Sequence, residues 1–197
     1  NPVVFRGKVY RFEYIKEKYA GNATGDSFFR FVNRESGETT PPFARGYHMG
    51  CAFIDQDTIY VSAMNQWDGE RIHIFKSDDF TNWESWVALD LPGYGMFNTS
   101  ICRTDEDYVM MFEVSKPPEV AGVRFTARFA RSKELRDWTL TPPECTYSKD
   151  RYTAPHCLRF LDGYFYNFYL EAFPDGWEQY VVRSMDFVHW ESSPLNP

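Results

Sequence analysis

The chain has 197 residues, and its 28 acidic residues outnumber its 21 lysines and arginines to give a formal net charge of −7 at pH 7. This balance argues against a nucleic-acid partner, and the lack of any run of about 18 apolar residues excludes a membrane-spanning helix. Aromatic residues make up 19% of the sequence, which favours pleated sheets and a binding site that stacks against flat ligands.

Strand-like runs recur along the chain in pairs, and a short polar turn joins the members of each pair. The pairs are 3–5 with 9–15, 51–54 with 58–63, 100–103 with 108–113, and 157–160 with 164–170. The last pair has Asp162-Gly163 at its turn, a strong signal of a β-hairpin. Helical periodicity is nowhere sustained, so we expect an all-β protein.

A seven-residue motif follows three of these pairs. It has a serine, an acidic residue two positions later, an apolar residue next, and a tryptophan six positions after the serine. The copies are 77–83, 132–138 and 184–190, so the serines stand 55 and 52 residues apart. We interpret the motif as the turn between the third and fourth strands of a repeat, whose serine and acidic side chains bond turn amides. Its tryptophan should pack between neighbouring repeats, a structural and not a chemical role.

Four strands in each repeat of about 50 residues are typical of β-propeller blades. We therefore expect one domain, a propeller of four-stranded antiparallel blades at 1–45, 46–95, 96–150 and 151–195. Asn1-Pro2 opens the first blade, and Asn196-Pro197 ends the chain. If Asn-Pro marks the start of an innermost strand, a further blade follows, and the four blades belong to a five-bladed ring.

In such a ring, the starts of first strands and the ends of second strands converge on a central pocket. Three carboxylates, Glu13, Glu113 and Glu171, stand at ends of second strands. Glu113 and Glu171 end apolar runs, where burial would raise the pKa of each carboxyl toward a value useful for proton transfer. The alternatives for each are exposure to solvent or an ion pair with an arginine. We expect Glu171 to be the catalytic acid, Glu113 its partner, and Glu13 to bind substrate.

Other predicted site residues could bind a sugar without reacting with it. His48, Asn98 and His156 stand at or near the starts of first strands, where they could bond ligand hydroxyls; for each histidine the alternative is a structural role. Trp67 and Trp177 lie in loops that should overhang the pocket and could stack on sugar rings. We expect no metal site, because few Asp or Cys residues accompany the histidines and the four cysteines form no CxxC pair.

The Asn-Pro-Val-Val opening, the 161–166 hairpin and the Ser-x-(Asp/Glu)-x-x-x-Trp turns resemble the five-bladed β-propeller glycoside hydrolases. This is the superfamily of arabinanases, fructosidases and mannoside-phosphorylase-like proteins. The resemblance implies a carbohydrate-active enzyme that cleaves glycosidic bonds of an oligosaccharide or polysaccharide by carboxylate acid/base catalysis. It implies no cofactor, although some relatives hold a structural calcium ion at the axis.

The blade starts depart from the family pattern, in which an aspartate usually stands at the start of the first blade and another on the next. Here the corresponding residues are Asn1, His48, Asn98 and Thr153. A missing blade could carry one of the carboxylates, or the chemistry could have moved to second-strand ends. The third alternative is a non-catalytic propeller that binds glycan or protein. The compartment, whether secreted, periplasmic or cytoplasmic, and the oligomeric state both stay open.

Overall fold

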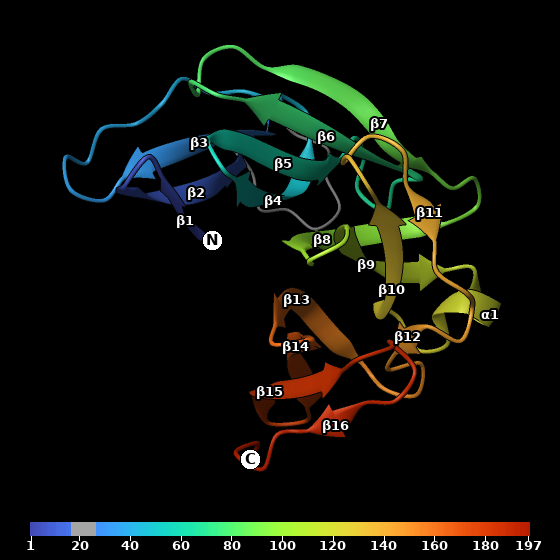
Figure 1. Ribbon diagram of the computed structural model, residues 1–197. Helices are drawn as coiled ribbons and strands as arrows, with labels where there is room; N and C mark the ends of the chain where they lie inside the picture. The colour runs from blue at the N-terminus through green and yellow to red at the C-terminus, as the bar shows by residue number, and fades with distance from the viewer. Residues whose placement is uncertain (17–26) are drawn as a thin grey trace. The chain divides into compact units, whose positions relative to one another are not determined.

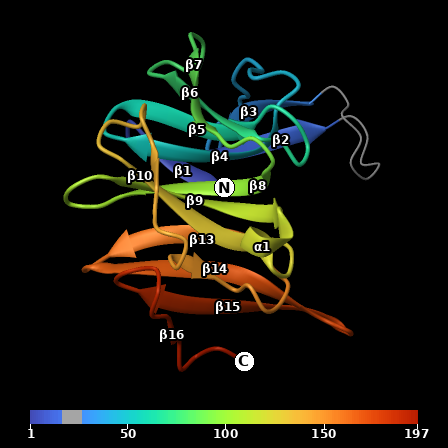
Figure 2. The same ribbon diagram turned by 90° about the vertical axis from the view of Figure 1, so that its right-hand side faces the viewer.

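The computed structural model describes residues 1–16 and 27–197, whose regular secondary structure is almost entirely β-strand (Figures 1 and 2). They divide into two compact units, Asn1–Leu91 and Pro92–Pro197, each built from two antiparallel sheets. The helix of the described chain, α1 (Pro118–Ala121), makes a single turn. No helix in these residues is long or apolar enough to cross a membrane.

The first unit holds two sheets whose strands follow one another in chain order. The first sheet comprises β1 (Pro2–Phe5), β2 (Lys8–Lys16) and β3 (Ser27–Asn33), and the second comprises β4 (His48–Asp55), β5 (Thr58–Met64), β6 (Arg71–Ser77) and β7 (Glu84–Asp90). In place of a fourth strand, two isolated bridges, Phe29 with Phe43 and Val32 with Thr39, extend the first sheet beyond β3. A cluster of phenylalanines and aliphatic side chains fills the layer between the two sheets.

The second unit repeats this arrangement. The third sheet comprises β8 (Gly95–Arg103), β9 (Tyr108–Lys116), β10 (Thr126–Ser132) and β11 (Thr139–Leu140), with β12 (Thr146–Tyr147) also paired to β10. The fourth comprises β13 (Thr153–Leu161), β14 (Tyr164–Phe173), β15 (Gly176–Ser184) and β16 (Glu191–Ser192). The predicted all-β chain of four antiparallel blades is thus confirmed, but only the second and fourth sheets have the four strands expected; the first has three and the third has five. The fifth blade stays a prediction.

The seven-residue motif forms the turn between third and fourth strands, as predicted. The Asp79 carboxylate accepts hydrogen bonds from the backbone N–H groups two and three residues later, each at 2.8 Å, and Asp186 accepts the equivalent pair at 2.9 and 2.8 Å. Backbone N–H donors hold the pKa of the Asp79 carboxyl well below its usual range. The apolar residue of the motif has a left-handed backbone in all three copies, with φ of 63°, 65° and 65° at Phe80, Leu135 and Phe187.

Each motif tryptophan closes its turn, and two of the three also join neighbouring sheets. The indole N–H donates to the carbonyl oxygen three residues earlier, at 3.1 Å in every copy. Trp83 of the second sheet's turn stacks on Phe43, 3.8 Å between ring centroids, at the edge of the first sheet. Trp190 of the fourth sheet's turn lies 5.9 Å from the ring of Phe129 in the third. The predicted packing role of the tryptophan is therefore confirmed within each unit.

We predict that Trp83→Ala lowers the free energy of unfolding by about 3 kcal/mol, because it removes a large ring from the layer between the first two sheets. Urea unfolding followed by circular dichroism measures this loss. Val87→Ala on the neighbouring strand is the control, since its side chain is 44% exposed and should change stability by less than about 0.5 kcal/mol. Equal effects of the two substitutions would contradict the packing role.

Candidate functional site

Two of the predicted carboxylates point into one layer, between the third and fourth sheets. Alternate residues of a strand point to the same face, and Val109 and Met111 of β9 pack in the cluster that joins these sheets, so Glu113 faces the same way. By the same alternation, Tyr169 of β14 faces this layer and so does Glu171. Both strands run past their predicted ends: Glu113 stands three residues before the end of β9 and Glu171 two residues before the end of β14. The structure thus places both carboxylates in one layer, within their strands and not at the ends.

Glu113 is a fully buried carboxyl with two hydrogen-bond donors. Asn98 donates from Nδ2 to Oε2 at 2.8 Å, and the backbone N–H of His156 donates to Oε1 at 2.7 Å. Burial raises the pKa of Glu113 to about 8, and the two donors lower it by less than burial raises it. Glu113 therefore keeps its proton at neutral pH, as a general acid must.

His156 contributes its backbone to Glu113, while its ring is fixed elsewhere. The ring Nε2–H donates to the carbonyl oxygen of Thr153 at 2.8 Å, and Nδ1 accepts from Nδ2 of Asn167 at 2.9 Å. Burial lowers the pKa of His156 to about 4, so the ring is neutral. A bulge between Thr153 and His156 interrupts the ladder to β14, which lets the His156 N–H reach Glu113. The ring is thus held by protein groups, and the role of His156 in substrate binding stays a prediction.

Glu171 is held in a different environment. Its Oε2 accepts from Nε of Arg151 at 3.1 Å, and Arg151 also donates to the hydroxyl of Tyr147 at 3.0 Å. That hydroxyl donates in turn to the hydroxyl of Tyr169 at 2.6 Å. Glu171, which we expected to be the catalytic acid, is thus the ion-pair partner of Arg151, and its catalytic role stays a prediction.

A chain of aromatic rings leads from Glu113 to the surface of the second unit. Phe97 stands opposite Glu113 in the ladder between β8 and β9, and its ring lies 4.9 Å from that of Phe125. Phe125 lies 5.1 Å from Tyr152, and Tyr152 lies 5.4 Å from Trp177. The Trp177 side chain is 54% exposed. Sequence reasoning found Trp177 but missed Tyr152 and Arg151, which precede β13 in a polar segment without a repeated pattern.

In the first unit, His48 and Trp67 lie side by side. Nδ1 of His48 lies 2.7 Å from the hydroxyl of Tyr14, and the rings of His48 and Trp67 meet edge to face at 6.4 Å. Burial, followed by the charge of Lys16, lowers the pKa of His48. The Lys16 ammonium itself lies 4.7 Å from the centre of the Trp67 ring.

Glu13 does not join this group. Its carboxylate oxygens accept from Nε of Arg11 at 2.7 Å and from Nε of Arg30 at 2.8 Å, and the bond from Arg30 is the main reason that the pKa of Glu13 is lowered. Because neighbouring residues of a strand point to opposite faces, Glu13 points away from the Tyr14 and His48 pair. Its role in substrate binding stays a prediction, and its observed partners are two arginines.

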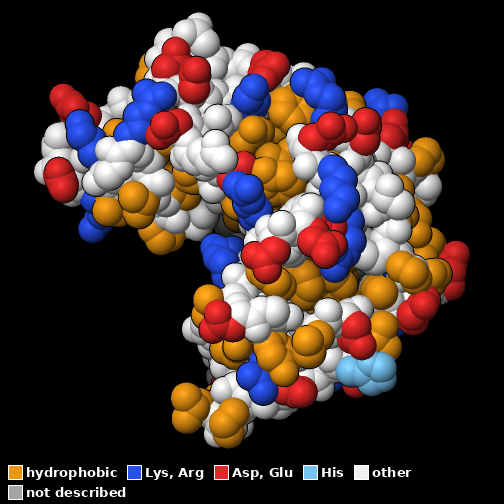
Figure 3. Space-filling model, in the orientation of Figure 1, with side chains coloured by type: hydrophobic (Ala, Val, Ile, Leu, Met, Phe, Trp, Pro, Cys, Tyr) orange, Lys and Arg blue, Asp and Glu red, His pale blue; other side chains and the backbone are white. Residues whose placement is uncertain are grey.

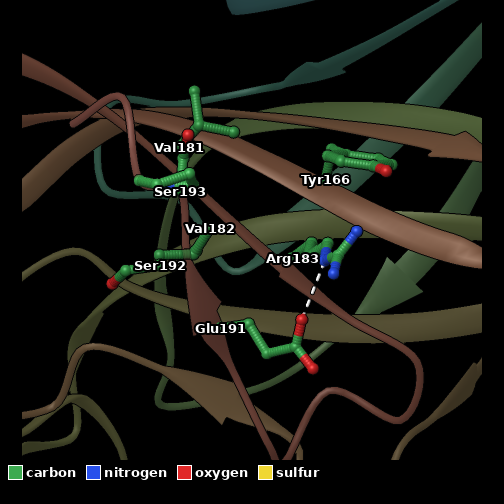
Figure 4. Close-up of a pocket in the computed structure, with 8 residues that line it drawn as sticks. Tyr166, Val181, Val182, Arg183, Glu191, Ser192 and Ser193 are labelled. Atoms are coloured by element: carbon green, nitrogen blue, oxygen red, sulfur yellow. Dashed lines mark hydrogen bonds and ion pairs between the residues drawn. The ribbon is translucent and has the colours of Figure 1, made fainter.

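A surface hollow of about 350 Å³ lies apart from these residues, along the outer strands β15 and β16 of the fourth sheet (Figure 4). Its charged pair is Arg183 and Glu191, joined at 2.8 Å, and it contains none of the predicted site residues. On the face drawn in Figure 3, acidic and basic side chains are interspersed. Among residues 1–16 and 27–197, no group of three His, Cys, Asp or Glu side chains is placed to hold a metal ion.

Comparison with known proteins gives a likeness in fold. No protein-family model and no curated protein sequence matches the chain. Among solved structures, it is similar to the GH32 β-fructofuranosidase BmSUC1 of Bombyx mori, with a TM-score of 0.68 and 11% identity over 98% of this chain and 47% of that one. It is also similar to the α-L-arabinofuranosidase PaAbf62A of Podospora anserina, in complex with cellotriose, with a TM-score of 0.69 and 9% identity over 100% of this chain and 67% of that one.

A third similar structure is the α-L-arabinanase of Penicillium chrysogenum complexed with arabinobiose, with a TM-score of 0.65 and 10% identity over 98% of this chain and 64% of that one. The chain therefore spans about half to two thirds of the length of these proteins. At such low identities the likeness is one of fold. That fold is a β-propeller-like arrangement of four antiparallel sheets.

We predict that Glu113 makes the wild-type protein less stable as pH rises. The pKa of Glu113 is about 8 in the folded state against 4.5 for an ordinary glutamate, so between these values the folded chain holds a proton that the unfolded chain has lost. Stability therefore falls with pH across this window, by roughly 3–5 kcal/mol in total. Urea unfolding at pH 5 and pH 8.5 should show this fall in the wild type and a much smaller one in Glu113→Gln. Parallel pH dependence in both proteins would contradict the raised pKa.

Proposed function

We propose that this protein is a glycoside hydrolase-like enzyme that cleaves glycosidic bonds of an oligosaccharide or polysaccharide by carboxylate acid/base catalysis. The observation that carries the proposal is a pair of carboxyl groups in one layer with opposite environments, Glu113 buried and protonated and Glu171 paired with Arg151. Two carboxyl groups in opposite protonation states are what glycoside hydrolysis requires. The names of the similar structures, a fructofuranosidase, an arabinofuranosidase and an arabinanase, support a carbohydrate substrate.

In this proposal Glu113 is the acid that protonates the leaving oxygen, and Glu171 is the carboxylate that activates water or attacks the sugar carbon. Asn98 binds a ligand hydroxyl, and the backbone of His156 keeps the Glu113 carboxyl in place. Trp177, with Tyr152 beside it, offers a flat apolar surface to a sugar ring. For His48, Trp67 and Glu13 of the first unit, sugar binding is a separate proposal. We also propose that the four blades belong to a five-bladed ring, on the basis of the family resemblance.

One observation favours the second candidate, a propeller that binds glycan without cutting it. The Glu113 side chain has no exposed surface, and Asn98 is the partly exposed residue bonded to it. A ligand would therefore contact the Asn98 amide, which lies between it and the Glu113 carboxyl. This arrangement allows binding without any movement, whereas catalysis by Glu113 requires that Asn98 move.

Hydrolysis of a panel of aryl glycosides and oligosaccharides separates the two candidates. We expect turnover by the wild type and a loss of kcat of about 10²–10⁴-fold in both Glu113→Gln and Glu171→Gln, the usual contribution of a general acid or base. Glu178→Gln, an exposed carboxylate on the next strand, is the matched control and should retain activity. Wild-type rates in Glu113→Gln and Glu171→Gln would overturn the residue assignment. Calorimetric binding of a sugar without turnover would favour the non-catalytic candidate.

We also predict that Trp177→Ala weakens oligosaccharide binding by about tenfold, because loss of one aromatic stacking surface costs about 1 kcal/mol or more. Calorimetry measures the dissociation constant. Val188→Ala, another exposed apolar residue of the fourth sheet at 40% exposure, is the control. Unchanged affinity in Trp177→Ala would remove this ring from the binding surface.

A further inference from the structure

Which group donates in the hydrogen bond between Glu113 and Asn98 depends on whether Glu113 carries a proton. An ionised carboxylate accepts from both donors seen here, the Asn98 amide and the His156 backbone N–H. A protonated carboxyl instead carries an O–H that must itself be donated. The backbone N–H of His156 can only donate, so it cannot receive this proton. Of the two partners of Glu113, only Asn98 has a side-chain oxygen, Oδ1, that can accept the proton of the carboxylic acid.

Asn98 is free to present either end of its amide. The oxygen and the NH₂ group have nearly the same size, so a half-turn of the amide exchanges them without displacing neighbours. Its side chain is partly exposed, and within residues 1–16 and 27–197 the bond to Glu113 is the hydrogen bond that holds the amide. Turning the amide therefore breaks no second hydrogen bond in the described part of the chain.

Asn167 shows the opposite situation in the same layer. Its side chain is fully buried, and its Nδ2 donates to Nδ1 of His156 at 2.9 Å. Nδ1 must accept, because the ring proton is held on Nε2 by the carbonyl oxygen of Thr153. The orientation of the Asn167 amide is therefore fixed, which makes Asn167 a built-in control.

The surroundings of Glu113 leave it as the group that changes charge near neutral pH. On β13 the His156 ring is neutral, with its pKa lowered to about 4 by burial. In the segment before β13, Tyr152 has its pKa raised by burial and then by the charge of Glu113. The ladder neighbours of Glu113, Phe97 on β8 and Ala127 on β10, do not titrate.

We propose that the Asn98 amide turns with the protonation of Glu113, donating from Nδ2 to the carboxylate and accepting at Oδ1 from the carboxylic acid. The end of the Asn98 amide that faces away from Glu113 therefore depends on the protonation of Glu113. It is the NH₂ donor when Glu113 is an acid and the carbonyl acceptor when Glu113 is a carboxylate. Resting on the proposed function, this makes Asn98 a positioning residue: it offers a donor to a sugar oxygen while Glu113 is the acid and an acceptor to a sugar hydroxyl while Glu113 is the carboxylate. The turn itself requires no catalysis.

Nuclear magnetic resonance on the full chain tests the turn without any substrate. We expect the Glu113 carboxyl carbon and the Asn98 side-chain NH₂ to titrate with one midpoint near pH 8. Above pH 8, Overhauser contacts should join the Asn98 NH₂ to the backbone N–H of His156. Below pH 8, these contacts should vanish. The Asn98 NH₂ should then also exchange faster with water, once the exchange rate is corrected for the pH dependence of free amides. The Asn167 NH₂ should keep its contacts throughout.

Two results would overturn the proposal: contacts from the Asn98 NH₂ to His156 that persist on both sides of the midpoint, or a Glu113 carboxyl that titrates in the ordinary range of glutamate. In Glu113→Gln, the Asn98 transition near pH 8 should disappear, and its survival would also count against the turn. None of these measurements depends on catalysis. The amide turn can therefore be observed in a protein that hydrolyses no substrate, and it can be absent in a protein that does.

The variant Asn98→Asp gives an independent measurement. Its carboxylate can accept the Glu113 proton but cannot donate to a Glu113 carboxylate, so the pKa of Glu113 should rise above the wild-type value. An unchanged or lowered pKa would show that the contact with Asn98 does not serve the acid form. Circular dichroism and the Asn167 contacts check that the variant keeps its fold.

Discussion

The structure depends on the packing of one sheet face against the next. Each unit buries a layer of aromatic and aliphatic side chains between two antiparallel sheets, and the motif tryptophans extend that layer at its edge. Because strand residues alternate between faces, this packing also decides which polar side chains enter the layer. Glu113 and Glu171 stand on the packed faces of β9 and β14, and burial of the first follows directly from the meeting of these sheets.

The two carboxyl groups of this layer have different neighbours. Around Glu113 the nearest polar groups are a neutral amide and a backbone N–H, which stabilise an anion less than water does. Arg151 brings a positive charge to Glu171 and links it to two tyrosine hydroxyls. One layer between sheets thus holds a buried, protonated carboxyl group and a carboxyl group paired with an arginine.

Much of the fold could be predicted, because its signals are local. A hairpin is encoded by alternating side chains and a turn such as Asp162-Gly163, whose φ angles of 50° and 80° suit the tight turn expected. The motif of serine, acidic residue and tryptophan bonds mostly within itself, so its role was readable from spacing alone. The site was harder. Asn167 was missed although it is a polar residue in the apolar run 164–170, a signal that spacing alone could have raised.

The sequence by itself determined the strands, their pairing into four blades, the turn between third and fourth strands, and the placement of Glu113 and Glu171 on second strands, which run two or three residues past them. Only the tertiary structure decided that Glu113 keeps a proton and that Glu171 pairs with an arginine. The partners responsible are distant along the chain: His156 bonds Glu113 from 43 residues away, and Arg151 reaches Glu171 across 20. A pKa depends on burial and on charges within a few ångströms, and these are set when separate sheets pack together.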